Sequence, residues 1–289
     1  MPRPPIDLHQ KVRDLLTHVG PPPAESDRPI DHFEHSANET LALIKYIDDH
    51  LPLGTMYPVV YERHMSHLRR MALGNLIQAF ERFLKEIAIV CVDGLVQFVN
   101  DDRFEEFKLT GGALAIQFAL DKSVGKAMCE SETWLSNKSI NERFKKLLKS
   151  PFAEQGWENL FPLRNQAPAG ERERANTLAI LWQVRHNIAH NVGFLTGSDS
   201  GKLRLLLEGK GAVQAERVLQ PNLSDLRFVK RFLLDAATNT NTRIGNRIAA
   251  LLTELHAANN TLFVPQELAD RVTDRFGYSL TVAGAAGVL

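Results

Sequence analysis

The stretch of this chain best suited to chemistry is Leu181–Thr196, LWQVRHNIAHNVGFLT. Within it an arginine, an amide and two histidines fall inside six residues, as Arg185, His186, Asn187 and His190. Histidine takes or gives a proton near neutral pH, because its unperturbed pKa is about 6.5. Arginine stays protonated, and its planar fork matches two phosphate oxygens. The combination suits proton transfer beside a phosphate that gains negative charge.

Apolar residues in the same stretch recur at helical spacing and predict a helix with one buried side. They are Leu181, Trp182, Val184, Ile188, Ala189 and Val192. On such a helix His186 and His190 stand four residues apart and share a face. Arg185 lies about 100° round from His186, and we expect its long stem to bring the guanidinium back over that face.

These groups fit the cleavage of RNA by its own 2′-hydroxyl. The reaction removes a proton from that oxygen, adds negative charge to phosphorus, and protonates the leaving 5′-oxygen. Histidine suits both proton transfers, and arginine suits the stabilisation of charge. No cofactor or metal ion is expected, because the nucleophile is already part of the substrate.

The segment 185–190, RHNIAH, resembles the R-x4-H signature of HEPN domains. These are compact helical bundles that include many metal-independent, RNA-cleaving toxins and defence nucleases. The family often places Asn, Asp or His directly after the arginine, and His186 fits that pattern. It also tends to place the motif in a helix late in the bundle, after a long helix. The resemblance covers about residues 60–255, and it implies an all-α, HEPN-like fold with RNA-cleaving activity.

The resemblance also implies roles for the motif residues. Arg185 and His190 would be catalytic, while His186 and Asn187 would orient the catalytic groups or contact phosphate. Active HEPN-like nucleases pair two copies of the motif across a dimer interface, so we predict a homodimer through the helix of 181–196. Which of His186 and His190 is the base and which is the acid stays open.

The function predicted is a metal-independent endoribonuclease that leaves a 2′,3′-cyclic phosphate and acts as a toxin or in defence against phage. Some HEPN toxins carry a tyrosine two residues after the histidine, which an antitoxin modifies, but Asn191 and Val192 follow His190 here. The chain has no P-loop and no Rossmann fingerprint, so an antitoxin or sensor would be a separate polypeptide. The sequence does not indicate which RNA is cut.

The same residues allow other interpretations. His186 and His190 have the i, i+4 spacing of a helical zinc pair, but Asn187 stands where H-E-x-x-H has its glutamate. A serine hydrolase would need G-x-S-x-G, and Cys91 lies on an apolar stripe where a buried thiol is the usual explanation. The main alternative is a catalytically inactive HEPN-like helical interaction or RNA-binding module, in which Arg185 and His190 satisfy buried polar groups.

Composition describes an ordinary soluble protein. Of the 289 residues, 44% are hydrophobic and 24% are charged. The 34 basic and 34 acidic residues cancel, so attraction to RNA must come from a local patch. The 2 cysteines, Cys91 and Cys129, suit a reducing compartment. With no signal sequence and no apolar run of about 20 residues, we expect a cytoplasmic protein without a membrane partner.

The elements that position the motif are predicted to be helices in one domain over residues 31–258. The expected helices are 36–50, 60–92, 139–148 (with a capping box from Ser139), 171–194, one capped by Ser224 with an apolar stripe to 255, and 266–276. A small β-hairpin is expected from 203–207 and 213–219. Residues 1–30 form a proline-rich arm with a short amphipathic helix, which packs on its own domain or on a second copy. Residues 259–289 form a C-terminal helix and tail.

A basic cluster begins the long helix of 60–92, with Arg63, His64, His67, Arg69 and Arg70. It is either a solvated face or a strip that contacts phosphate. The second interpretation makes Arg63, His67 and Arg70 candidate RNA-binding residues. Further along, Glu81 falls within the apolar part of the same helix.

Overall fold

The computed structural model describes residues 28–50, 58–96, 98–99, 102–105, 107, 123–129, 134–163, 165, 168–190, 195–207, 217–259 and 274–276. Residues 1–27 of the predicted N-terminal arm lie outside this part of the chain, as does most of the predicted C-terminal helix and tail. The last residues assigned to the arm, Pro29 and Ile30, already belong to the first described helix.

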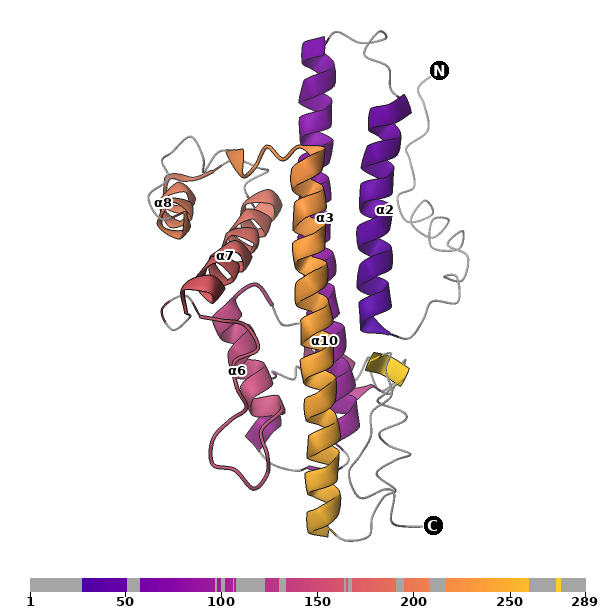
Figure 1. The fold of residues 1–289 in the computed structure, drawn as a ribbon, viewed down its shortest axis with the longest axis vertical. Helices are drawn as coiled ribbons and strands as arrows, with labels where there is room; N and C mark the ends of the chain where they lie inside the picture. Colours follow the sequence, from indigo (N-terminus) through magenta and orange to yellow (C-terminus); the bar gives the residue numbers. More distant parts are fainter. Residues whose placement is uncertain are drawn as a thin grey trace, which may run out of the picture.

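All the regular structure in the described part of the chain is helical, which confirms the all-α prediction. Two long helices, α3 (Pro58–Leu95) and α10 (Leu223–Asn259), pack against each other along the length of the molecule (Figure 1). α2 (Pro29–His50) contacts both, and α7 (Ala169–His190) crosses on the other side. The shorter elements are η2 (Asp102–Phe104), α5 (Val124–Cys129), α6 (Asn137–Leu147) and α8 (Gly197–Leu206). No described helix is both long enough and apolar enough to cross a membrane.

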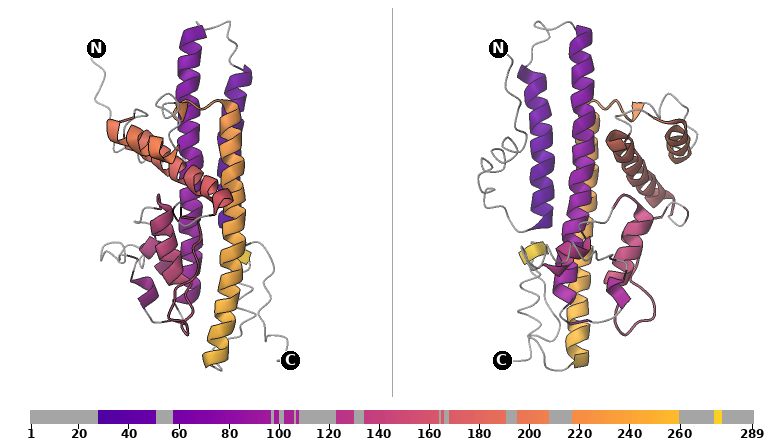
Figure 2. Two further views of the ribbon diagram at one scale, coloured as in Figure 1. Left: turned by 60° about the vertical axis from the view of Figure 1, so that its left-hand side comes forward. Right: turned by 180° about the vertical axis from the view of Figure 1, so that it is seen from behind.

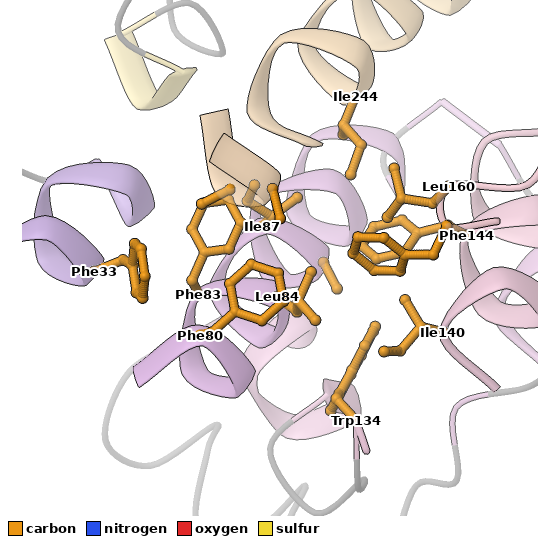
Figure 3. Packing of buried hydrophobic residues seen from close by; sticks show 14 of the residues in the cluster. Phe33, Phe80, Phe83, Leu84, Ile87, Trp134, Ile140, Phe144, Leu160 and Ile244 are labelled. Atoms are coloured by element: carbon orange, nitrogen blue, oxygen red, sulfur yellow. The ribbon is translucent and has the colours of Figure 1, made fainter. Parts of the chain in front are cut away.

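The core is built on α3, which contacts α2, α5, α6, α7 and α10. Its buried apolar residues recur at helical spacing and include Leu73, Leu76, Ile77, Phe80, Phe83, Leu84, Ile87 and Cys91. Aromatic rings join the layers: Phe80 lies edge-on to Phe33 of α2 at 5.8 Å between centroids, and stacks on Trp182 of α7 at 5.8 Å. In Figure 3, Phe33 lies beside Phe83, and Phe144 of α6 lies across the core from them. α3 thus presents one continuous apolar surface to the helices on both its sides.

Two helices are capped by residues other than those expected. α6 starts at Asn137 after an N-cap at Ser136, so Ser139 lies in its first turn, where its hydroxyl donates to the carbonyl oxygen of Ser136. The predicted capping box from Ser139 is therefore wrong. α10 is capped by Asn222, whose Oδ1 accepts from the backbone N–H of Asp225 while Oδ2 of Asp225 accepts from that of Asn222, each at 2.9 Å. This reciprocal pair, and not Ser224, starts the helix.

The first strand of the predicted β-hairpin is also wrong, because residues 203–206 form the end of α8. The cause is local. The Thr196 hydroxyl accepts from the backbone N–H of Asp199 at 3.1 Å and donates to Oδ2 of Asp199 at 2.6 Å. This N-cap starts a helix at Gly197 that continues through Gly201. Residues 208–216, which include the start of the second predicted strand, lie outside the described residues.

α7 runs obliquely to α3 (Figure 2), and its Ile188 lies close against Gly74 of α3. A Cβ atom added at Gly74 would lie 3.2 Å from Cγ2 of Ile188, which is tighter than ordinary van der Waals contact. The absence of a side chain at Gly74 therefore lets the C-terminal end of α7 sit against α3. That end carries the motif residues.

Replacing Gly74 with leucine should lower the free energy of unfolding by about 1–3 kcal/mol, because the new side chain must displace Ile188 or push α7 away. The matched control is Gly201→Leu in α8, where nothing lies within 4 Å of the added Cβ. There the better helix propensity of leucine should leave stability unchanged or slightly raised. Urea denaturation measures both variants, and equal effects at the two positions would contradict the close crossing.

Candidate functional site

The two histidines of the motif lie together on the surface of α7. His186 and His190 are both exposed, and their ring centroids are 4.7 Å apart at an interplanar angle of 47°. Four residues apart on a helix, they share a face as the spacing predicts. Both imidazoles can therefore reach a substrate or a second protein molecule.

Arg185 points to a different part of the molecule. Its Nη2 lies 3.5 Å from Oε2 of Glu81 on α3, and 24% of its side chain is exposed. The expectation that its guanidinium returns over the face of His186 is wrong. The physical reason is the burial of Glu81, whose side chain is only 6% exposed and whose negative charge needs a cation beside it.

Glu81 is the residue to which sequence analysis assigned no role. Its Oε2 lies beside Arg185. Its Oε1 accepts a hydrogen bond from the backbone N–H of Trp134 at 3.3 Å and lies 3.7 Å from Nζ of Lys85. One carboxylate thus links α3 to α7 and to the segment before α6. Its signal in the sequence is a charged residue inside an apolar helical stripe, because a buried charge of this kind requires partners.

Asn187 is fully buried. Its Nδ2 donates to the carbonyl oxygen of Gln183 at 2.8 Å, one turn earlier in α7. A side chain in this position does not reach a phosphate at the surface. Of the two roles predicted for Asn187, only the orientation of its neighbours is compatible with this burial.

The histidine face borders a groove of about 580 Å³ between α6, α7 and α8. His186 and Gln183 line it from α7, Asn137 from α6, and Lys202 from α8. Gln183 Nε2 donates to Oδ1 of Asp199 at 2.9 Å, which fixes the start of α8 against α7. The groove therefore holds donors and acceptors next to one of the two imidazoles.

Asp199 places a negative charge near this groove. The Thr196 hydroxyl donates to its carboxylate and holds the pKa of Asp199 below its usual value, and the charges of Lys202 and His186 act in the same direction. The carboxyl is therefore ionised at neutral pH. Its charge attracts a cation, and His186 supplies one when protonated.

The predicted RNA-binding residues divide into two groups. Arg63 and His67 are exposed on α3. Arg70 is half-buried, and its Nε donates to the carbonyl oxygen of Leu219 at 3.0 Å, tying α3 to the segment before α10. Its neighbour Arg69 lies 3.2 Å from Asp48 of α2. The basic cluster thus has an exposed part, while Arg69 and Arg70 hold helices together.

Cys91 is a core residue, as its position on the apolar stripe predicts. Its side chain is 1% exposed, and burial raises the pKa of its thiol well above the usual value. A thiol of this kind is not a nucleophile near neutral pH. This agrees with the interpretation of Cys91 as structural.

A search of family models, curated proteins and solved structures finds no match to this chain. Function must therefore be argued from the motif and its surroundings. The structure brings His186 and His190 together at the surface, turns Arg185 to Glu81, and buries Asn187.

A double-mutant cycle can measure the link between Glu81 and Arg185. Glu81→Gln should cost about 1–3 kcal/mol of stability, because it leaves a largely buried guanidinium without its counter-charge. Arg185→Gln should cost a similar amount, and the double variant should cost less than the sum. The coupling free energy should be about 1 kcal/mol or more by urea denaturation.

The control cycle uses Lys138 and Glu142, an i, i+4 pair on α6 whose side chains are 78% and 57% exposed. Its coupling should be about 0.3–0.5 kcal/mol, because water screens an exposed pair. A Glu81–Arg185 coupling no larger than this control would rule out the pair as the anchor of α7.

Proposed function

We propose that this protein is a metal-independent endoribonuclease with a HEPN-like helical bundle, which cleaves RNA by attack of the 2′-hydroxyl. The observation that carries the proposal is the pair of exposed imidazoles, 4.7 Å apart, on the helix that also holds Arg185. His190 and His186 supply the proton transfers, and Arg185 stabilises the phosphorane-like charge. The products are a 2′,3′-cyclic phosphate and a free 5′-hydroxyl.

The geometry of the pair favours catalysis by two protomers. The attacking and leaving oxygens lie in line on opposite sides of phosphorus, so the base and the acid must flank the phosphate. Two rings 4.7 Å apart are in contact with each other and leave no space for a phosphate between them. The histidines of one protomer therefore act from one side, and those of a second protomer act from the other.

A homodimer through the C-terminal part of α7 supplies this arrangement. Arg185 and His190 stand five positions apart, or about 140° round the helix, and so face different sides of one protomer. A two-fold axis beside the exposed end of α7 brings one protomer's imidazoles toward its partner's motif. Dimerisation is then a requirement for activity and not only for stability.

The ion pair of Arg185 favours a second candidate, a catalytically inactive helical module that binds RNA or protein. An arginine side chain that is 24% exposed and paired with a buried carboxylate such as Glu81 is a structural group in many proteins. In this case the motif maintains the packing of α7 on α3 and performs no chemistry. A direct RNA-cleavage assay distinguishes the two candidates, because only the nuclease cuts RNA.

For the nuclease, we propose a cytoplasmic toxin or an effector of phage defence. A separate antitoxin or sensor protein would control it, because unrestrained cleavage of RNA would harm the cell that makes the enzyme. The target RNA is set by loop shape and stacking, which the motif does not encode.

Purified protein in the presence of a chelator should cleave total RNA, and His190→Ala should lower the rate by about 10²–10⁴-fold, the usual contribution of general acid–base catalysis. Arg185→Lys should also lose most activity while remaining folded, because lysine keeps the charge opposite Glu81 but not the bidentate fork. His186→Ala, assayed in parallel over a range of pH, shows which limb of the pH–rate profile depends on each histidine and so which acts as base and which as acid.

The control is His35→Ala, which removes an exposed histidine of α2 outside the motif and should leave the rate unchanged. Substrate with 2′-deoxyribose at the cleaved position should resist the wild-type protein. Full activity of the His190 variant, or no cleavage of any RNA by the wild type, would leave the inactive module as the better candidate.

Mixing Arg185→Lys protein with His190→Ala protein should restore part of the activity, because a mixed dimer contains one intact Arg185, one intact His190 and both copies of His186 in its shared cleft. Sedimentation equilibrium should show dimers for each protein alone. Recovered activity should follow the fraction of mixed dimers. Monomers with full activity would rule out the shared site.

A further inference from the structure

A second hollow, of about 620 Å³, lies along α3 away from the histidine groove. Its walls come from the start of α2, the middle of α3, α5, the short helical segment at 274–276, and α7. The only motif residue among its described lining is Arg185, which therefore joins the hollow to the candidate site.

The described lining of the hollow is strongly cationic. Its positive side chains are Arg82, Lys85, Lys126, Arg185 and Arg275. Two carboxylates, Glu81 and Glu86, stand against these five cations, which leaves a formal charge of +3 with His32 neutral. The whole chain has no net charge, so this is a pronounced local excess. The amino end of α2, at Pro29, adds the partial positive charge of a helix N-terminus.

The two carboxylates of the hollow pair with three of its five basic side chains. Glu86 lies 2.7 Å from Nε of Arg82 and 2.8 Å from Nδ1 of His32. Glu81 lies between Lys85 and Arg185. These pairs hold the long basic side chains in defined positions, which lowers the entropy lost when an anion binds.

We propose that this hollow binds the phosphodiester backbone of a single-stranded RNA next to the scissile phosphate. The proposal rests on the proposed nuclease function, since Arg185 belongs to both. The lining from Gln78 to Val90 spans about 18 Å along α3, which suits several successive phosphates better than one small anion. Ile89 and Val90 add an apolar wall that a base or ribose can contact.

The hollow also aligns with the exposed part of the predicted basic cluster. His67, Gln78 and Lys85 are spaced 11 and 18 positions along α3, which places them within about 20° of one another on the helix. α7 crosses α3 between them, where Ile188 meets Gly74. A strand that follows this face of α3 from the hollow toward His67 must therefore pass the motif end of α7.

The test measures binding of a short fluorescent oligouridylate to full-length His190→Ala protein, which binds without cutting. Adding Arg82→Gln and Lys126→Gln should weaken binding at least tenfold at low salt. The slope of log affinity against log salt should fall by about 1.4, since each phosphate contact to a single strand contributes about 0.7. Arg82 is 71% exposed and Glu86 keeps His32 as a partner, so the variant should fold.

The matched control is Lys45→Gln on α2. Lys45 is 57% exposed and also has an i, i+4 carboxylate, Asp49, but does not line the hollow. Its removal should leave affinity and slope unchanged. Equal slopes for the hollow and control variants would overturn the proposal. The proposal would also be overturned if inorganic phosphate displaced the oligonucleotide at a phosphate concentration equal to the oligonucleotide concentration that saturates the protein. The hollow would then be a site for small anions.

These outcomes are separable from those of the nuclease assay. If the wild-type protein cleaves RNA but RNA binding does not depend on Arg82 and Lys126, the hollow is not the RNA-binding site and the nuclease proposal still stands. If RNA binding depends on the hollow but the protein cuts no RNA, the hollow is an RNA-binding site and the inactive module becomes the better candidate.

Discussion

The arrangement of this molecule depends on one buried carboxylate. Glu81 lies in the apolar surface of α3, and a charge there is stable only with a cation and hydrogen-bond donors close by. Arg185 supplies the cation, and the backbone of Trp134 supplies a donor. The carboxylate thereby connects three parts of the chain that are remote in sequence. It also determines which way the arginine of the motif points.

The consequence is a motif whose members face in different directions. The apolar residues of α7 pack on α3 and α6, and the close contact of Ile188 with Gly74 fixes the rotation of α7 about its axis. With that rotation fixed, Arg185 opens to the basic hollow and His186 to the groove beside α8. A single copy of the helix therefore keeps Arg185 apart from His186 and His190, and this separation is the physical reason for proposing a second copy.

The sequence predicted the long helices well, because apolar periodicity is a local property. The helix expected over 60–92 is found as α3, and that expected over 171–194 is found as α7 as far as His190. The shared face of His186 and His190 was predictable for the same reason. The predicted first strand of the hairpin was wrong. The hydrogen bonds between Thr196 and Asp199 start a helix, and this helix includes the leucines at 203–206 whose pattern had indicated a strand.

The direction of Arg185 could not be predicted from its own helix. A long arginine side chain can reach several faces of its helix, and it points toward the face where a carboxylate needs a counter-charge. That carboxylate is Glu81, about a hundred positions earlier, and only the packing of α7 on α3 brings the two together.

If this neutral chain acts on RNA as proposed, it must concentrate positive charge where the RNA binds. Here the excess lies in the hollow beside α3, where two paired carboxylates cancel part of the positive charge and hold three of the cations in place. Arg185 is the residue at which this cationic surface meets the histidine-bearing helix. If its guanidinium shifts from Glu81 to a phosphate, Lys85 remains 3.7 Å from that carboxylate and can balance its charge. Glu81 is thus able to release the arginine to a substrate without being left as an isolated buried charge, which makes a structural ion pair compatible with a catalytic role for the same arginine.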